Sequence, residues 1–213
     1  LLAGVLAIGN TITSDSSRNH ISTIGAVEYE EQLVPTLDNM GNYTFECDRD
    51  FRIMQLTDVH FGGGVMSTHK DVMAINAVAT MIKAEKPDLV VLTGDQIKGY
   101  SSSFHGKNGK ENVRNALKAI IAPFEQKNVP FAITFGNHDS EGAANKEEMM
   151  EMYEAYDCFV GCAGEDLTGC GNYNLPIMSS DGSKVAYNIW CIDSLTYNRH
   201  PEDKNDVAYY END

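Results

Sequence analysis

The chain has 213 residues, and its 31 acidic against 16 basic side chains give a formal net charge of −15. A field of that sign repels nucleic-acid backbones, which argues against a basic nucleic-acid-binding surface; a bound phosphate would need metal cations to reverse the local charge. The length suffices for one sizeable core, and the ordinary composition argues against extensive disorder.

The chain begins with a short apolar stretch, LLAGVLAIGN, which runs into the polar TITSDSS. The stretch is too short to span a bilayer and is typical of the end of a secretory signal; a buried N-terminal strand is the alternative. We expect residues 1–40 to be a signal-peptide remnant and lead-in, and residues 41–213 to be the N-terminal part of one domain. The protein is then secreted or extracytoplasmic, with no membrane span.

Three of the five cysteines crowd into residues 158–170. In an exported protein this clustering fits a loop stapled by a disulfide, and free, half-buried thiols fit it equally well. Zinc is less suited to the run, because it lacks a second tight cysteine pair.

From residue 42 onward, apolar periodicity predicts alternating strands and helices. Two strands are expected around a turn at 48–50, and the helix over 68–85 is expected to start with a capping box made by Thr68 and Asp71. Pro123 predicts a kink or early stop near the end of the second helix. The remaining elements expected are strands at 87–95, 129–137, 172–178 and 184–193, helices at 111–128 and 146–156, and a hairpin turn at 180–183.

Strand, helix, strand, helix, strand is the order of a parallel sheet wound with helices. Because such crossovers are right-handed, the strand ends that lead into helices gather on one edge, where ligands bind. Each of the three strands ends in polar residues of the metal-ligand type, in the segments Asp58-Val59-His60, Gly94-Asp95 and Gly136-Asn137-His138-Asp139.

Carboxylates, an amide carbonyl and imidazoles suit Mn, Fe or Zn. Asp58 and His60, two residues apart at a strand end, face the same side and can hold one ion. Asp95 can bridge two ions, and Asn137 can offer its carbonyl to the second. Two divalent ions about 3.5 to 4 Å apart form a clamp for displacement at phosphorus, with an activated water as the nucleophile.

His138 lies next to a proposed ligand and is free to take another role. It can donate a proton to the leaving alkoxide or stabilise charge on the phosphoryl oxygens. Asp139 can hydrogen-bond the far nitrogen of His138 and hold the ring in place. Lys98 and Tyr100 are expected near the rim, within reach of a phosphate or leaving group.

The blocks QLTDVHFG, DLVVLTGDQI and VPFAITFGNHDSEG resemble the first three signature blocks of the calcineurin-like metallophosphoesterases. The nearest subgroup in appearance is the Dcr2-like phosphatases, related to purple acid phosphatases. The resemblance implies a four-layer α/β/β/α sandwich, incomplete here at the C-terminus. It implies that Asp58 and His60 hold the first ion, Asp95 bridges, Asn137 holds the second ion and His138 is catalytic.

Three departures from the family's patterns matter. The Asp-Arg-Gly of protein phosphatases is replaced by Gln96-Ile97-Lys98-Gly99, and Lys98 stands where purple acid phosphatases place a metal-binding tyrosine. The family's later histidine ligands, including a Gly-His-x-His block, are not recognisable, since His200 lacks that context. We therefore expect weak metal retention and little activity from this stretch alone.

The expected activity is metal-dependent hydrolysis of a small phosphorylated substrate, with phosphate monoesters favoured. Two alternatives stay open. One is a phosphodiesterase of the same fold, and the other is a non-catalytic extracellular binding module that has lost its metals.

Overall fold

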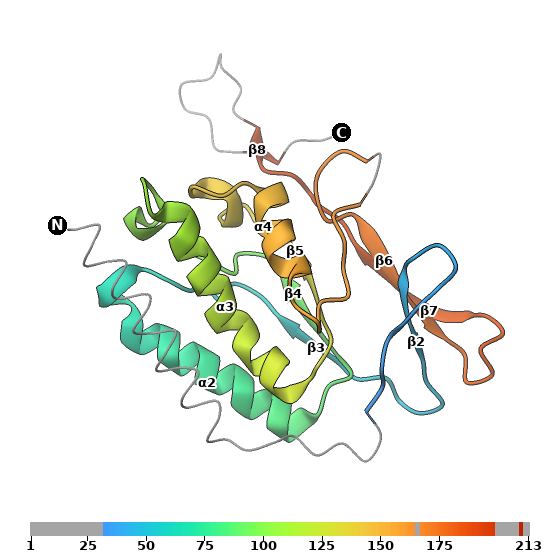
Figure 1. The fold of residues 1–213 in the computed structure, drawn as a ribbon. Helices are drawn as coiled ribbons and strands as arrows, with labels where there is room; N and C mark the ends of the chain where they lie inside the picture. Colours follow the sequence, from blue (N-terminus) through green and yellow to red (C-terminus); the bar gives the residue numbers. More distant parts are fainter. Residues whose placement is uncertain (1–31, 165–166, 199–208, 211–213) are drawn as a thin grey trace.

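A computed structural model describes residues 32–164, 167–198 and 209–210 (Figure 1). Residues 1–31 and His200 lie outside this part, so the signal peptide and secretion stay predictions. No helix in the described part is long and apolar enough to cross a bilayer. The strands are β1 (Thr36–Leu37), β2 (Tyr43–Glu46), β3 (Ile53–Leu56), β4 (Leu89–Thr93), β5 (Phe131–Thr134), β6 (Tyr173–Met178), β7 (Val185–Cys191), β8 (Tyr197–Asn198) and β9 (Tyr209–Tyr210). The helices are α2 (Thr68–Glu85), α3 (Gly109–Lys127) and α4 (Lys146–Glu154), with short 3-10 turns η1 (Gly64–Met66), η2 (Ser102–Phe104) and η3 (Asp139–Glu141).

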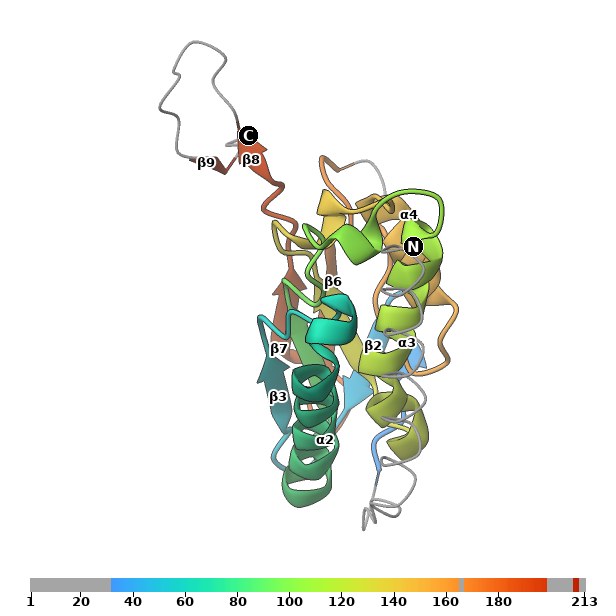
Figure 2. The same ribbon diagram turned by 90° about the vertical axis from the view of Figure 1, so that its left-hand side faces the viewer.

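The predicted parallel sheet is present, in the order β3-β4-β5. Successive residues of β4 face opposite sides of this sheet: Val90 and Leu92 pack toward the helices, whereas Leu89 and Val91 pack toward a second sheet. This explains the continuous apolar run of the strand, because both of its faces are buried. Figure 2 shows α2 and α3 running side by side along one face.

The helices follow the predicted apolar stripes, but they differ from the predictions at the start of α2 and at Pro123 in α3. The capping box is absent from α2: Ser67 is the N-cap residue, and its hydroxyl donates to the Asp71 carboxylate over 2.6 Å. A capping box is present instead in α4, between Asn145 and Glu148. Of the kink or early stop expected at Pro123, the early stop does not occur, since the helix continues past Pro123 to Lys127.

A second sheet, in the order β1-β2-β6-β7, covers the other face of the parallel sheet. The predicted hairpin of β6 and β7 is antiparallel, and β2 joins β6 in parallel. The two strands around the turn at 48–50 therefore enter different sheets. Phe45, Leu175 and Ile177 fill the core between the sheets.

The described residues thus form helices, parallel sheet and second sheet as three stacked layers (Figure 1). This mixed α/β architecture agrees with the expected sandwich, of which the outer helical layer is not among the described residues. All five cysteines are free thiols; Cys158 is buried, and its Sγ donates to Glu125 Oε1 over 2.5 Å.

Candidate metal centre

Backbone pairing continues beyond the ends of the parallel strands and fixes the loops that follow them. Asp58 N donates to Gly94 O over 3.1 Å, and His60 N donates to Asp95 O over 2.9 Å. Phe61 then forms an isolated parallel bridge with Ile97. The loops after β3 and β4 are therefore held side by side, as the right-handed topology predicts.

Asp58, His60 and Asp95 form one cluster at this edge, with a ligand atom of each within 4.8 Å of the others. His60 Nε2 lies 3.5 Å from Asp58 Oδ1 and 3.6 Å from Asp95 Oδ2. These separations are too long for good hydrogen bonds. They match donors around one ion, because ligand atoms about 2.0–2.2 Å from an ion lie roughly 3 to 3.5 Å from each other.

The far nitrogen of the His60 ring lacks the partner that a metal-bound histidine usually has. His60 Nδ1 is buried and has no hydrogen-bond partner among the described residues, whereas histidines that hold a metal ion usually donate this N–H to a neighbouring acceptor. The fit to a divalent cation therefore rests on the residue types and separations of Asp58, His60 and Asp95.

The backbone at the cluster is unusual, since φ is positive at Asp58 (54°), His60 (47°) and Asp95 (52°). The left-handed region is uncommon for residues other than glycine, although Asp and His tolerate it better than most. Such conformations cost on the order of 1–3 kcal/mol each and gather at functional sites. The folded chain thus places all three donors in sparsely populated conformations.

Asp95 divides its two carboxylate oxygens between two neighbours. Oδ2 faces His60, whereas Oδ1 accepts the His138 backbone N–H over 3.0 Å. Oδ2 is therefore the Asp95 oxygen that faces the cluster, and Oδ1 is occupied by the backbone. Gly136 is needed for this approach, because a Cβ at that position would lie 2.1 Å from Asp95 Oδ1.

Asn137 lies between Gly136 and His138, both of which donate backbone hydrogen bonds to side chains of this edge. Its side chain is half-buried. The structure brings together Asp58, His60 and Asp95, and the role of Asn137 as a donor to a second ion stays a prediction.

His138 stands beside the cluster, with its ring centroid 5.5 Å from that of His60 and 4.8 Å from that of Tyr100. Its Nδ1 lies 2.7 Å from Glu141 Oε2. Tyr100 packs edge-on against His138 and remains 54% exposed. The prediction that Tyr100 lies at the rim of the site is confirmed.

The expected contact between Asp139 and the His138 ring is wrong. The Asp139 carboxylate is buried and accepts backbone hydrogen bonds from Asp95, Ile97 and Gly136, at 3.0, 3.1 and 2.8 Å. Burial raises the pKa of Asp139 to about 7, against the lowering effect of those hydrogen bonds. Asp139 therefore joins the loops after β4 and β5.

Sequence reasoning missed Glu141, the carboxylate that meets the ring. The available signal was its position three residues after His138, because residues i and i+3 of a 3-10 turn lie on the same side.

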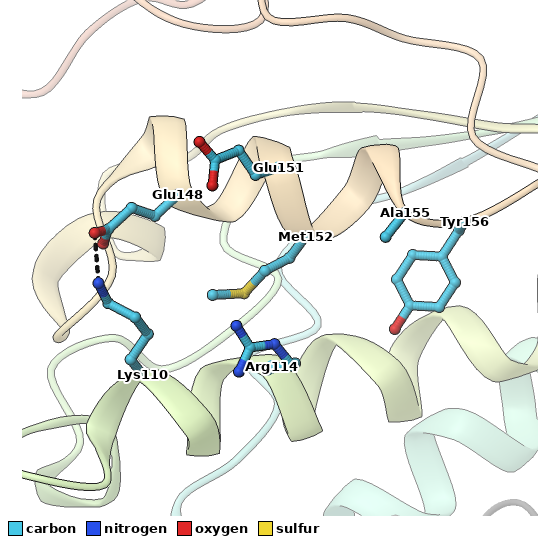
Figure 3. Close-up of a pocket in the computed structure, with 7 residues that line it drawn as sticks. All are labelled: Lys110, Arg114, Glu148, Glu151, Met152, Ala155 and Tyr156. Atoms are coloured by element: carbon cyan, nitrogen blue, oxygen red, sulfur yellow. Dashed lines mark hydrogen bonds and ion pairs between the residues drawn. The ribbon is translucent and has the colours of Figure 1, made fainter.

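A pocket of about 380 Å³ lies elsewhere, between α3 and α4 (Figure 3). Its charged groups are largely paired, since Lys110 contacts Glu148 and Arg114 contacts Glu111. None of the cluster residues lines it. The pocket is therefore separate from the candidate metal centre.

The profile of one protein family, the calcineurin-like phosphoesterases, matches residues 51–211. Among curated proteins, "Probable inactive purple acid phosphatase 29" of Arabidopsis thaliana is 28% identical over 191 residues, which cover 79% of this chain and 46% of that protein. "Probable inactive purple acid phosphatase 28" of the same plant is 30% identical over 165 residues, which cover 67% of this chain and 40% of that protein. "Phosphatase DCR2" of Saccharomyces cerevisiae is 28% identical, with coverages of 69% and 27%.

The chain spans less than half the length of each of these three relatives. No solved structure matches it significantly.

Proposed function

Because the chain belongs to the calcineurin-like phosphoesterase family, we propose that it takes part in metal-dependent hydrolysis of phosphate monoesters at the edge of the β3-β4-β5 sheet. The observation that carries this proposal is the cluster of Asp58, His60 and Asp95, with His138 beside it. The carboxylates and imidazole of this cluster are the donors that Mn, Fe or Zn accepts.

Two bound ions would supply Lewis acidity and an activated water at neutral pH. Asp58 and His60 would hold the first ion, Asp95 would be shared by the two ions, and Asn137 would hold the second. The net charge of −15 gives the metal-free protein little attraction for a phosphate. Metal cations bound by these side chains would supply the positive charge that a phosphate needs.

His138 has the position of a proton donor in this proposal. Its ring lies beside the cluster, and its Nδ1 is already occupied by Glu141, which leaves Nε2 for the leaving-group oxygen. The half-exposed ring of Tyr100 would form the wall on which that leaving group lies.

A non-catalytic role is the second candidate, and one observation favours it: two of the relatives carry the words "probable inactive" in their names. Retention of Asp58, His60, Asp95, Asn137 and His138 favours catalysis.

Hydrolysis of p-nitrophenyl phosphate in the presence of Mn, Fe or Zn salts tests the proposal. We expect turnover that a chelator abolishes and that added metal restores. Faster release from bis(p-nitrophenyl) phosphate would instead indicate a phosphodiesterase. Absence of both metal binding, measured by calorimetry, and turnover of either ester would support the binding module that has lost its metals.

A further inference from the structure

The imidazole of His138 makes one side-chain hydrogen bond among the described residues, between Nδ1 and Glu141 Oε2 at 2.7 Å. A carboxylate has acceptors and no donor, so the proton of this bond belongs to Nδ1. Nε2 is then the nitrogen with a free lone pair in the neutral ring. The contact thus selects one of two tautomers.

The backbone of this segment leaves His138 little freedom other than rotation of its ring. Its N–H donates to Asp95 Oδ1, and its carbonyl accepts from Glu141 N over 3.3 Å within the 3-10 turn η3. The loop after β4 also packs on it, because a Cβ at Gly99 would lie 1.9 Å from the His138 carbonyl oxygen. A group that stops the ring from rotating therefore completes its placement.

Other groups near the ring do not fill this role. Asp139 is buried and occupied by three backbone N–H groups, so it is not available to Nδ1. Tyr100 and His60 contribute ring contacts at 4.8 and 5.5 Å between centroids, which restrict tilt without choosing a tautomer. Both His138 and Glu141 are about two-thirds shielded from solvent, with side-chain exposures of 28% and 32%.

We propose that Glu141 is the positioning residue for His138, fixing the tautomer and orientation that present Nε2 to the oxygen of the leaving group. This rests on the proposed function, in which His138 donates the proton: the ring carries a second proton on Nε2, passes it to the leaving-group oxygen as the ester bond breaks, and is left as the neutral Nδ1–H tautomer that Glu141 favours. Partners that orient functional histidines typically change activity by about 10–100-fold when they are removed. The tautomer itself is a property of the protein without metal or substrate.

The first experiment measures the ¹⁵N chemical shifts of the His138 ring in the metal-free protein, at a pH where the ring is neutral. We expect Nδ1 to be protonated in the wild type, and Glu141→Ala to move the proton to Nε2 or average it over both nitrogens. Glu141→Gln should keep it on Nδ1, since the amide oxygen still accepts. An unchanged Nδ1–H tautomer in Glu141→Ala overturns the proposal.

Glu111→Ala is the matched control, because Glu111 also forms an i,i+3 contact, with Arg114 on the surface of α3. It should leave the His138 spectrum unchanged. Thermal unfolding of each variant establishes that the spectra come from folded protein.

The second experiment compares substrates by their need for a proton donor. Glu141→Ala should lower kcat for an alkyl phosphate such as glycerol phosphate by about 10–100-fold and lower it less for p-nitrophenyl phosphate, whose leaving group needs little protonation. KM should stay within a factor of two or so, and Glu141→Gln should restore part of kcat. Equal loss for both substrates overturns the positioning role. A wild type inactive on both rejects the proposed function, while the ring spectra still decide the tautomer.

Discussion

The two ends of β4 carry buried or nearly buried aspartates with opposite surroundings. At the amino end, Asp88 forms a two-pronged contact with the Arg49 guanidinium, at 2.9 and 2.7 Å, and accepts the Arg52 N–H over 2.8 Å. At the carboxyl end, Asp95 faces His60 at 3.6 Å, and no lysine or arginine of the described residues pairs with it.

The difference shows how a site is told apart from a structural ion pair. Asp88 is neutralised by the protein's own cation in a bidentate geometry, which is a strong arrangement. Asp58, His60 and Asp95 converge at backbone positions with positive φ, and within the described part of the chain no lysine or arginine forms an ion pair with either carboxylate. The same residue type therefore forms a structural ion pair at one end of the strand and belongs to the candidate metal centre, the proposed binding end, at the other.

The largest expected effect comes from removing the aspartate at the binding end. Asp95→Asn should weaken metal binding by more than about 100-fold and abolish turnover, because the variant loses the carboxylate shared between the ions. The metal-free variant should be at least as stable as the wild type, since repulsion with Asp58 is relieved. Calorimetric titration with Mn²⁺ or Zn²⁺ and chemical denaturation measure both results; tight metal binding by the variant would contradict the assignment.

The matching substitution at Asp88 should lower the stability of the fold and leave metal binding nearly unchanged. Asp88→Asn should lower the free energy of unfolding by about 2 kcal/mol, less than for a fully buried pair because the Arg49 side chain is 35% exposed. Metal affinity should stay within a few-fold of the wild type. Urea denaturation followed by the same titration tests this, and a loss of metal binding by folded Asp88→Asn would erase the contrast between the two ends.

Metal addition itself should stabilise the folded chain. An ion that binds only the native state adds about 2.7 kcal/mol at a free concentration 100 times its Kd. Differential scanning calorimetry should therefore show a rise in Tm with Zn²⁺ or Mn²⁺ for the wild type and Asp88→Asn. If Asp95→Asn shows the same rise, the ion binds elsewhere.

The smallest expected effect concerns the rim. Tyr100→Ala should raise KM for p-nitrophenyl phosphate by about 3–10-fold, because an aromatic contact contributes roughly 0.5–1.5 kcal/mol. Tyr100→Phe should behave like the wild type, and KM for glycerol phosphate should change little. Steady-state kinetics with each substrate measures these KM values. An equal rise in KM for both substrates would contradict a contact between Tyr100 and the leaving group.

Much of the fold was predictable because its signals are local. The stripe through Ile75, Ala79 and Ile82 predicts α2, and the apolar run after Pro87 predicts β4. The polar residues at the strand ends predicted the cluster, since parallel topology brings those ends to one edge. The partition of β2 and β3 into different sheets was not predictable, because sequence periodicity carries no information on which strands pair.

The amino-acid sequence by itself determined the parallel sheet and the donors Asp58, His60 and Asp95, because both follow from hydrophobic periodicity and from residue type at strand ends. Tertiary structure alone decided the partner of His138. Asp139 and Glu141 are both carboxylates within three residues of it, and only the burial of Asp139 against the backbone N–H groups of Asp95 and Ile97, more than 40 residues away, leaves the ring to Glu141. The backbone N–H groups of Asp95 and Ile97 need an acceptor, and they meet the Asp139 carboxylate only once the chain has folded.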